Sequence, residues 1–353
     1  MDALGPQSKA SRVVLMFGSQ TGKALSVDTP IPTPNGWKNM GDIRVGDEVF
    51  DEKGKPCNVS FVTNYQYNRK CYELEFSDGQ TILADEDHIW SVEYDMGKGA
   101  KPLLLKTSEI LPIYKKGNRN TLAIKTTEPL KTTTKKLSLD PYCLGVWLGD
   151  GHSYSGQITL HEDDQEILTH FEDKGFNVQR RYIDKRRPTT MNALIDGVRN
   201  KKYCRRGHDK EFYGVASSGC CKKCARQRST YDQHGKTPPD PVLPKKPSFT
   251  NRLTSLGVLG NKHIPSQYLR AGRNQRLALL QGLMDTDGYV SKNGGACEFC
   301  SSSERLTDDV FELLCSLGFK PKKSKKVKVG AFVLNFTAYS STKIFRLQRK
   351  QNR

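Results

Sequence analysis

Residues 280–288 read LQGLMDTDG, and residues 143–151 read CLGVWLGDG. The two stretches share one pattern, in which an apolar run with an internal glycine ends in an aspartate followed by a second glycine. This pattern is that of a pair of helices, because the small residues Gly145 and Gly282 permit close backbone approach across a pseudo-twofold seam. The sequence therefore predicts two helices packed against each other.

Each predicted helix ends in a carboxylate held beside a glycine turn, at Gly151 and at Gly288. Asp150 and Asp287 are then expected close together at the base of the pair, where two like charges need a cation between them. Mg²⁺ prefers oxygen ligands and phosphate. Two metal ions beside a phosphodiester stabilise the attacking and leaving oxygens of an in-line displacement. The pattern therefore predicts a magnesium-dependent phosphodiester hydrolase site.

The copy at 280–288 follows the LAGLIDADG pattern almost letter for letter, and the copy at 143–151 is looser. The chain thus resembles the DOD-type LAGLIDADG homing endonucleases, whose antiparallel strands form a saddle that straddles DNA. The resemblance implies a two-repeat αββαββα fold, a site-specific double-strand cut, and a monomer with internal pseudo-twofold symmetry. The first strand of each repeat and the helix after it are expected at 157–160 and 164–174, and at 296–300 and 304–317.

The charge of the chain favours a nucleic-acid partner. The formal net charge is +18, and the basic excess is concentrated in a few segments, as a surface that binds a polyanion requires. The alternative is a solvated basic face that serves only solubility. No apolar run approaches the roughly 20 residues that span a bilayer, so we do not expect a membrane partner.

The ten cysteines do not follow a disulfide framework. Only four share a metal-like spacing, and the others stand singly in apolar runs of a chain without a signal peptide. This usage favours a reducing, cytoplasmic setting in a bacterium or phage. Cys297 and Cys300 have a metal-like spacing, but no second pair or histidine lies near them in the sequence, so we interpret them as core packing.

From Ala24 to about Tyr94, short alternating apolar runs are separated by turn signals, which predicts a compact all-β unit. Residues 24–31, together with 46–50, resemble the start of an intein. Residues 78–90 resemble the histidine-bearing intein motif. The resemblance implies the horseshoe-like Hint fold that inteins share with the hedgehog autoprocessing domain.

The first intein residue departs from the standard pattern. A standard intein opens with Cys or Ser, whose side chain attacks the preceding peptide bond, but Ala24 has no nucleophile. His88 followed by Trp90 is similar to the variant inteins that dispense with this nucleophile and use an internal cysteine. The resemblance implies that His88 strains or protonates the scissile amide after Lys23, with Asp85 standing where Thr is commoner. Without its motif, His88 would be interpreted as an ordinary histidine in a β-turn.

The first repeat carries an insertion at 198–247 with the spacing of a zinc ribbon. Its four candidate zinc ligands form two pairs with short internal spacing: Cys204, His208, Cys221 and Cys224. This spacing suits a small tetrahedral structural zinc site. Cys220 could replace Cys221, and a disordered basic loop with incidental cysteines is the alternative.

Two basic clusters are expected to contact DNA phosphates. In the insertion they are Arg205, Arg206, Lys222 and Lys223, which would lengthen the DNA footprint. The second cluster includes Lys322, Lys323 and Lys325. We expect it on a loop between a helix and a strand, where it suits backbone contact better than base reading.

Residues 12–23, RVVLMFGSQTGK, indicate a buried strand that runs into a phosphate-binding loop. Gly18, Gly22 and Lys23 would hold phosphate, but the loop is one residue short of the usual spacing and continues into Ala24 instead of Ser or Thr. A generic glycine-rich turn is the alternative. If an intein starts after Lys23, the first residue after the intein would restore the missing hydroxyl. This favours a P-loop ATPase as host, such as the large subunit of a phage terminase.

These observations together predict an α+β multidomain chain. Its parts are a host fragment at 1–23, an all-β splicing region at 24–130 and an endonuclease at 131–353. Strands are expected at 103–105 and 122–124, with a soft boundary near Leu130. No stretch resembles the C-terminal splicing motifs, so splicing in cis is not expected unless that part is supplied.

Three functions of different class follow from the sequence. The first is an intein-encoded homing endonuclease that cuts the host gene lacking the intein. The second is a catalytically degenerate intein remnant that only binds DNA, against which the retention of Asp150 and Asp287 argues. The third is a nucleotide hydrolase with an unrelated tail, which lacks a second acidic motif to hold Mg²⁺.

Overall fold

A computed structural model gives the fold of the chain. It describes residues 25–94, 102–116, 122–182, 189–196, 210–213, 221–226, 247–291, 295–326, 330–338 and 341–352. Nine candidate site residues lie outside these ranges: Gly18, Gly22, Lys23, Ala24, Cys204, Arg205, Arg206, His208 and Cys220. Among the described residues, no helix has both the length and the apolar character needed to cross a bilayer.

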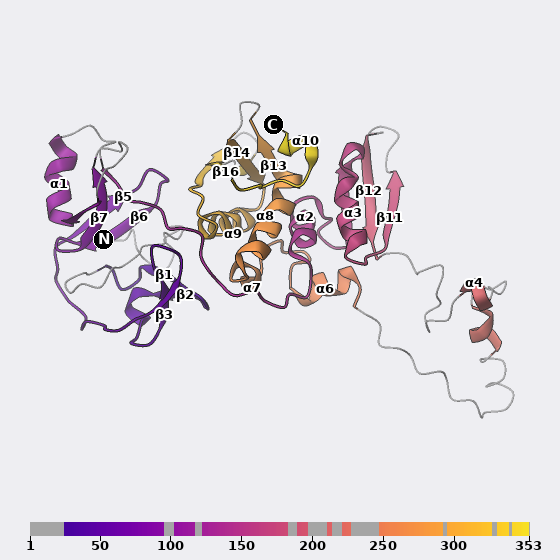
Figure 1. Cartoon of the computed structure of the whole chain (residues 1–353), viewed down its shortest axis with the longest axis horizontal. Helices are drawn as coiled ribbons and strands as arrows, with labels where there is room; N and C mark the ends of the chain where they lie inside the picture. The colour runs from indigo at the N-terminus through magenta and orange to yellow at the C-terminus, as the bar shows by residue number, and fades with distance from the viewer. Residues whose placement is uncertain are drawn as a thin grey trace, which may run out of the picture.

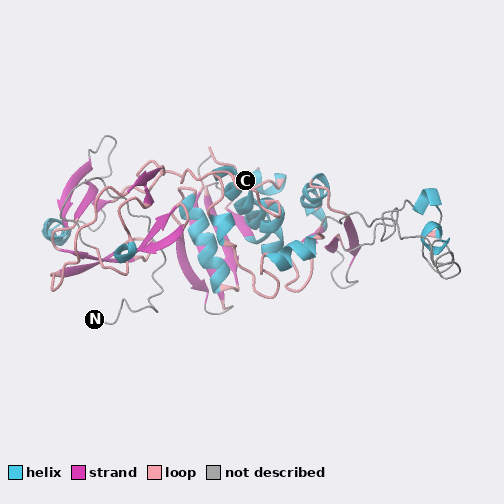
Figure 2. Ribbon diagram, turned by 90° about the horizontal axis from the view of Figure 1, so that it is seen from below, coloured by secondary structure: helices cyan, strands magenta, loops and turns pink. Residues whose placement is uncertain are grey.

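The region up to residue 130 consists mainly of short antiparallel strands, whereas helices gather in the rest of the chain (Figure 2). Its strands are β1 (Pro30–Thr33), β2 (Gly36–Asn39), β3 (Glu48–Phe50), β4 (Pro56–Asn58), β5 (Cys71–Glu75), β6 (Thr81–Asp85), β7 (Ile89–Tyr94), β8 (Pro102–Lys106) and β9 (Leu122–Ala123). They pair as β1–β2, β3–β4 and β5–β6, and as a three-stranded sheet in the order β8–β7–β9. A small core of Leu25, Ile82, Ala84, Trp90 and Val92 joins β6 to β7.

The prediction that this region is purely β was wrong in two places, the first being the short 3₁₀ helix η1 (Met40–Asp42) and the second a longer helix. Helix α1 (Thr107–Lys116) follows β8 directly. Glu109 in its first turn accepts the backbone N–H of Lys106 at 2.7 Å, and an acidic side chain at that end stabilises a helix start. The strands expected at 103–105 and 122–124 coincide with β8 and β9.

The region after residue 130 is built around helices α2 (Pro141–Asp150) and α8 (Arg273–Asp287), which lie between two sheets (Figure 1). The first sheet has the order β10–β12–β11 and the second the order β13–β14–β16–β15. Their strands are β10 (Gln157–His161), β11 (Val178–Tyr182), β12 (Thr190–Ile195), β13 (Gly288–Val290), β14 (Ala296–Ser301), β15 (Lys322–Lys326) and β16 (Ala331–Thr337). The further helices are α3 (Glu166–Asp173), α4 (Lys210–Tyr213), α6 (Phe249–Ser255), α7 (Ser266–Leu269), α9 (Glu304–Ser316) and α10 (Gln348–Gln351).

The expected strand and helix of each repeat are present as β10 and α3, and as β14 and α9. In the second repeat, however, β13 precedes β14, so the strand predicted as the first is the second. The first repeat retains only an isolated bridge between Gly151 and Ile158 at the corresponding place. The two repeats therefore share the order of their strands and helices, except that the second has a full strand, β13, where the first has a single bridge.

The lysine run predicted as a loop forms strand β15, and that prediction was wrong. Its residues pair in antiparallel register with β16. The ammonium groups of Lys323 and Lys325 lie 5.2 and 4.9 Å from the centre of the Phe332 ring. Because aliphatic lysine stems can pack on an aromatic face while the charge stays in water, a run of lysines can serve as an edge strand.

The helix pair is held so closely that neither seam glycine could carry a side chain. A Cβ on Gly282 would lie 2.3 Å from the Tyr142 carbonyl oxygen, and a Cβ on Gly145 would lie 2.3 Å from the Leu279 carbonyl oxygen. Helix α2 begins at Pro141, where Asp140 accepts the N–H groups of Tyr142 and Cys143. The seam is therefore formed by backbone packed on backbone.

Gly151 and Gly288, which were expected to form glycine turns at the helix ends, are needed for a different reason. Gly151 and Gly288 have φ of −74° and −90°, which any residue can adopt. A Cβ at either position would instead meet the carbonyl oxygen of the last helical turn, at 2.2 Å from Trp147 and 2.4 Å from Met284. These glycines are required by space and not by a left-handed backbone.

The two regions meet at a buried ion pair. Arg270 and Glu312 are 2.6 Å apart with side chains 6% and 5% exposed, and the Trp37 indole N–H donates to Glu312 at 2.8 Å. The guanidinium of Arg276 is fully buried and donates to the carbonyl oxygens of Ala271, Ser316 and Leu130. The segment near residue 130 is thus fixed against the second region.

Replacement of Gly282 by alanine should destabilise the second region by about 3 kcal/mol or more, because the added methyl would meet backbone atoms that cannot move aside. Urea denaturation followed by tryptophan fluorescence measures this change. Asn274→Ala, at an exposed position of the same helix, is the control and should change the free energy of unfolding by less than about 0.5 kcal/mol. Equal midpoints for the Gly282 variant and the wild type would contradict backbone contact at the seam.

Candidate nuclease site

Asp150 and Asp287 are the last residues of α2 and α8, so the close helix pair brings the two carboxylates together. A Cβ on Gly149 would lie 3.3 Å from the Asp287 Oδ2 and 2.0 Å from the Thr286 hydroxyl oxygen. The end of each helix therefore lies directly against the other. Both aspartates are half-buried, so a polar ligand can reach them from one side.

Burial makes both carboxylates hard to ionise, and the charge of Asp150 adds to this effect at Asp287. Burial raises the pKa of Asp150 above its usual range. Burial, followed by the charge of Asp150, raises the pKa of Asp287 to about 7. The nearby ammonium groups of Lys262 and Lys350 lower both pKa values in part. A cation bound between the carboxylates would relieve this cost.

Lys262 stands at the end of α2. Its ammonium donates to the carbonyl oxygen of Gly149 at 2.8 Å and lies 5.3 Å from the centre of the Trp147 ring. Burial lowers the pKa of Lys262, and the charges of Asp287 and Asp150 act in the opposite direction. This lysine is placed to offset the negative charge of the site.

The loop that carries Lys262 is fixed to helix α9. Asp309 accepts the backbone N–H of Ile264 at 2.8 Å, and Arg305 donates to the side-chain oxygen of Asn261 at 3.1 Å. Ile264 is itself buried. Lys262 is therefore held by contacts on both sides of it in the sequence.

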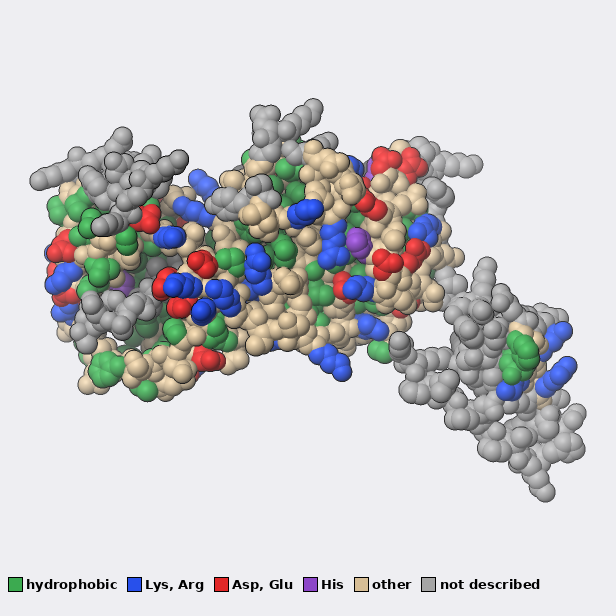
Figure 3. Space-filling view, in the orientation of Figure 1, with side chains coloured by type: hydrophobic (Ala, Val, Ile, Leu, Met, Phe, Trp, Pro, Cys, Tyr) green, Lys and Arg blue, Asp and Glu red, His purple; other side chains and the backbone are tan. Residues whose placement is uncertain are grey.

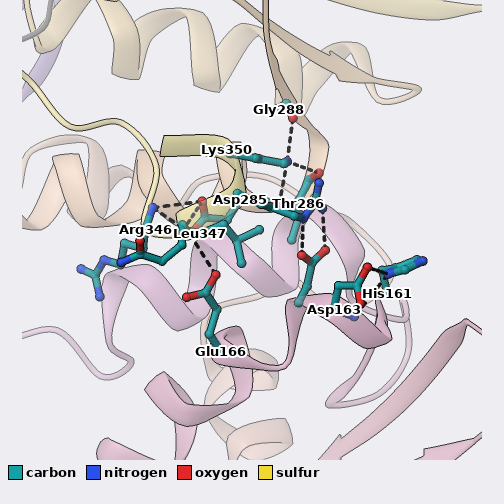
Figure 4. A network of polar contacts seen from close by, with 12 residues as sticks. His161, Asp163, Glu166, Asp285, Thr286, Gly288, Arg346, Leu347 and Lys350 are labelled. Carbon is teal, nitrogen blue, oxygen red and sulfur yellow. Dashed lines mark hydrogen bonds and ion pairs between the residues drawn. The ribbon is translucent and has the colours of Figure 1, made fainter. Parts of the chain in front are cut away.

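Lys350 holds the corresponding end of α8. Its ammonium donates to the carbonyl oxygens of Met284, Asp285, Thr286 and Gly288, at 2.9, 2.8, 3.2 and 2.7 Å (Figure 4). A cation at the carbonyl end of a helix is favourable for the helix dipole. Burial lowers the pKa of Lys350 to about 8.

Sequence reasoning missed both lysines. Neither belongs to the repeated motif, and each reaches the site from a segment with no periodic signal. A second acidic residue of the motif, Asp285, has a structural role instead. It is buried and accepts the Tyr142 hydroxyl at 2.8 Å and the backbone N–H groups of Arg346 and Leu347.

Asp150 and Asp287 fit a hard divalent cation, but they supply only part of its ligands. Within the described part of the chain, no group of three or more His, Cys, Asp or Glu side chains could hold a metal ion. Asp150 and Asp287 supply only carboxylate oxygens, the donors that Mg²⁺ prefers. An ion bound there would complete its coordination with water and with phosphate oxygens of a substrate.

The three residues predicted for splicing lie together in the first region. Asp85, His88 and Trp90 are 2%, 2% and 3% exposed. The His88 ring stands edge-on to the Trp90 ring with centroids 4.6 Å apart, and the Trp90 indole N–H donates to the Thr107 hydroxyl, whose own donor reaches the His88 carbonyl. Leu25 bridges to Ala84, which brings the start of this region to the same strand as Asp85.

Asp85 is enclosed by its own partners. One carboxylate oxygen accepts the backbone N–H of Asp87, and the other accepts the Arg69 Nε–H at 3.2 Å. Arg69 also pairs with Asp87 at 2.5 Å. The acid that stands where a threonine is commoner is therefore neutralised by a neighbouring guanidinium.

The structure brings together only part of the remaining predicted sets. Cys221 is buried and Cys224 half-buried, while the other two candidate zinc ligands lie outside the described residues. Lys222 is exposed, and the Lys223 ammonium lies 5.0 Å from the centre of the Tyr213 ring.

The basic residues of β15 are not equivalent. Lys323 is engaged by Glu304 and Asp308, whereas Lys322 and Lys325 are exposed on the same strand. In the orientation shown in Figure 3, lysine and arginine side chains are spread over the middle of the molecule and not gathered in one patch. Of the β15 lysines, Lys322 and Lys325 are thus the better placed to contact an anion.

Comparison with known proteins gives one family match. Residues 274–346 match the LAGLIDADG-like domain. The chain is 33% identical over 358 residues to a replicative DNA helicase DnaB of Mycobacterium intracellulare, with 93% of the chain and 49% of that protein aligned. It is 48% identical over 80 residues to a replicative DNA helicase DnaB of Mycobacterium leprae, across 23% of the chain and 13% of that protein. The chain therefore spans about half the length of the first relative and a small part of the second.

Two solved structures are also similar in part. A zinc-bound Msm DnaB1 intein splicing domain is 48% identical, covers 20% of the chain and 56% of its own, and has a TM-score of 0.20. The homing endonuclease I-DmoI in complex with DNA and Ca is 13% identical, covers 61% of the chain and 95% of its own, and has a TM-score of 0.32. None of these relatives is a terminase, so the comparisons give that host hypothesis no support. Residues 1–23, on which it rested, lie outside the described part of the chain.

Stability of the metal-free protein should depend on Asp287 in a defined direction. The folded pKa of about 7 exceeds the unfolded value near 3.8, so the contribution of the Asp287 carboxyl to stability is fully present below about pH 4 and is lost as the pH rises towards 7. Asp287→Asn, which stays neutral, should match the wild type near pH 4 and exceed it by about 4 kcal/mol at pH 8, because each pKa unit is worth about 1.4 kcal/mol. Thermal unfolding in EDTA measures the difference, and added Mg²⁺ at pH 8 should stabilise the wild type only. A variant no more stable than the wild type at pH 8 would show that the carboxylate is not strained.

Proposed function

We propose that the chain belongs to an intein inserted in a replicative DNA helicase gene, and that residues 131–353 form a site-specific LAGLIDADG homing endonuclease. The family match at 274–346 and the relatives support an intein with a LAGLIDADG endonuclease. The helicase host replaces the terminase hypothesis, because the relatives that align over the chain are named as helicases. The roles proposed below for individual residues rest on the geometry of the site.

The observation that carries the nuclease proposal is the pair of helix ends. Asp150 and Asp287 end two helices whose backbones touch at Gly145 and Gly282, and the pKa of Asp287 is raised to about 7 by burial and then by the charge of Asp150. Two half-buried carboxylates that repel each other form a site for a divalent cation. A phosphodiester backbone is the substrate class whose charge and oxygen atoms complete such a site.

The chain's own residues position and neutralise the reacting groups. Mg²⁺ bound by Asp150 and Asp287 would supply a Lewis acid for the scissile phosphate and its attacking water. Lys262, held at the carbonyl end of α2, places a positive charge beside the developing negative charge. Lys350 fixes the carbonyl end of α8 and thereby the position of Asp287.

Binding of double-stranded DNA is proposed from charge and architecture. The net charge of +18 favours a polyanion, and each repeat carries an antiparallel sheet beside the helix pair. Phosphate contacts would come from exposed lysines such as Lys322 and Lys325. The duplex then lies across both repeats of a single chain, which fits a monomer.

The first region is proposed to retain part of a splicing site. His88 would act on the amide between Lys23 and Ala24, with Trp90 and Thr107 holding its ring and backbone. Because Ala24 offers no nucleophile, splicing would need an internal nucleophile and the C-terminal splicing motifs. Zinc binding by the segment at 198–247 is a separate proposal, based on the spacing of its cysteines and histidine.

The experiment that tests the nuclease is cleavage of duplex DNA that carries the uninterrupted helicase gene. The wild type should make one specific double-strand cut that requires Mg²⁺. Asp287→Asn should lower the rate at least about 100-fold because it removes a carboxylate that would hold Mg²⁺, and Lys262→Met should lower it about 100-fold because it removes a positive charge beside the scissile phosphate. Gel analysis of cut, nicked and intact DNA measures the rates.

Lys325→Met is the matched control for Lys262→Met, because it removes an exposed lysine far from the helix ends in the sequence. It should weaken DNA binding and reduce its salt dependence without abolishing the cut. Specific binding without any cut by the wild type would favour the degenerate, DNA-binding remnant. Absence of both binding and cutting in a folded protein would reject the nuclease.

A further inference from the structure

Residues 344–352, here called the strap, cross from one repeat to the other. Ile344, Phe345 and Leu347 are 4%, 5% and 1% exposed and belong to the main core. The strap ends in helix α10, which lies above the helix pair (Figure 1). The apolar side chains of the strap pack in the core, and its polar groups bind residues of both repeats.

On the side of the second repeat, the strap binds helix α8. The backbone N–H groups of Arg346 and Leu347 donate to Asp285 at 3.1 to 3.2 Å. The Arg346 Nε–H donates to Gln281 at 2.8 Å, and Lys350 binds the last carbonyl oxygens of α8. Figure 4 shows Arg346 and Leu347 beside Asp285, and Lys350 beside Thr286 and Gly288, at the end of the helix.

On the side of the first repeat, the strap binds the corner that follows strand β10. Arg349 donates two parallel hydrogen bonds to the Asp164 carboxylate, from Nε to Oδ1 at 2.5 Å and from Nη2 to Oδ2 at 2.7 Å. The Asp164 side chain is 8% exposed. The backbone N–H of Gln348 also donates to Glu166, the first residue of α3, at 2.9 Å.

We propose that the strap is a clasp that holds the two repeats in the relative position needed to cut both DNA strands, and that Arg349 and Asp164 are its positioning residues. The proposal rests on the proposed nuclease function. Asp164 lies in the segment that connects β10 to α3 in the first repeat. Lys350 fixes the end of α8 that carries Asp287. Because α10 carries both contacts, the sheet of one repeat is linked to the carboxylate of the other.

The Arg349–Asp164 pair suits this role better than an ordinary surface pair. Its fork geometry fixes orientation as well as distance, and a nearly buried carboxylate has few water molecules to replace a lost partner. The aspartate of an exposed pair would be re-solvated at little cost. Loss of Arg349 should therefore release the strap from the first repeat while its apolar side chains remain in the core.

The test compares Arg349→Ala and Asp164→Ala with the wild type on target DNA, at a temperature where circular dichroism shows every variant to be folded. Each variant should bind DNA in EDTA within about threefold of the wild type but cut it about 10-fold to 100-fold more slowly, with nicked DNA accumulating. Arg349→Lys, which keeps the charge and one donor, should recover part of the rate. Glu172→Ala is the control, since it breaks the exposed Arg180–Glu172 pair in the same repeat.

The double variant separates a clasp from two independent effects. If the residues act as one contact, Asp164→Ala combined with Arg349→Ala should be no slower than either single variant. Additive losses, or cleavage at the wild-type rate after loss of Arg349, would overturn the proposal. So would equal losses of binding and cleavage, which a merely destabilised protein would show.

The wild type in the same gel distinguishes a failure of the clasp from a failure of the proposed function. If it binds DNA without cutting, the nuclease is rejected, and the clasp is judged from unfolding alone. Each single variant should then lower the melting temperature by about 2–4 °C, and the double variant by no more than the larger single shift. Additive shifts would reject the clasp independently of any nuclease activity.

Discussion

The second region depends on one packing constraint, the contact of two helix backbones at Gly145 and Gly282. A methyl group at either position would meet a carbonyl oxygen at 2.3 Å, so the helices can be this close only because both residues lack a side chain. The contact fixes the separation of the helix ends, and with it the separation of Asp150 and Asp287. The sheets of the two repeats flank the same pair (Figure 1). One distance between backbones therefore sets both the geometry of the charges and the spacing of the surfaces beside them.

That constraint creates an electrostatic cost which the fold reduces but does not remove. Two carboxylates forced together with partial loss of water resist ionisation, and the pKa of Asp287 reaches about 7. Lys262 and Lys350 each bind the carbonyl end of one helix, so the same two side chains neutralise the helix dipoles and face the acids. The symmetry of the motif is thus repeated in a pair of lysines that the motif itself does not contain. The part of this cost that the lysines leave uncompensated is the basis of the proposed cation site.

Much of this fold was predictable, because repeated local patterns report local structure. The two motif helices, the strands near 157 and 296 and the helices after them follow from the sequence. Strand β15 did not, since it forms by pairing with β16 and by packing of Lys323 and Lys325 on Phe332 of that strand. Lys262, Lys350 and the strap were missed for the same reason. Their partners are backbone carbonyls and side chains far away in the sequence, and such contacts leave no periodic trace.

The motif also misleads in one respect that only the structure corrects. Asp285 looks like a second acid of the site, yet it is bound by the Tyr142 hydroxyl and two backbone N–H groups of the strap. In the first copy of the motif, Leu148 stands at the equivalent place and is buried in the core. The inequality of the two copies is therefore a structural adaptation, because only the helix of the second repeat has a strap to hold.

The ion pair between Arg270 and Glu312, covered by Trp37, has a consequence for how such a gene can shrink. The indole of the first region donates to a carboxylate of the second, and the Lys131 N–H donates to the carbonyl of Gly54 across the same boundary. A deletion that removed everything after residue 131 would remove Glu312, to which the Trp37 indole donates. It would also expose a protein surface shaped for a neighbour that no longer exists. Simple excision of the nuclease therefore costs the remaining part a contact that the longer chain has, and a substitution at Trp37 is one change that would compensate for it.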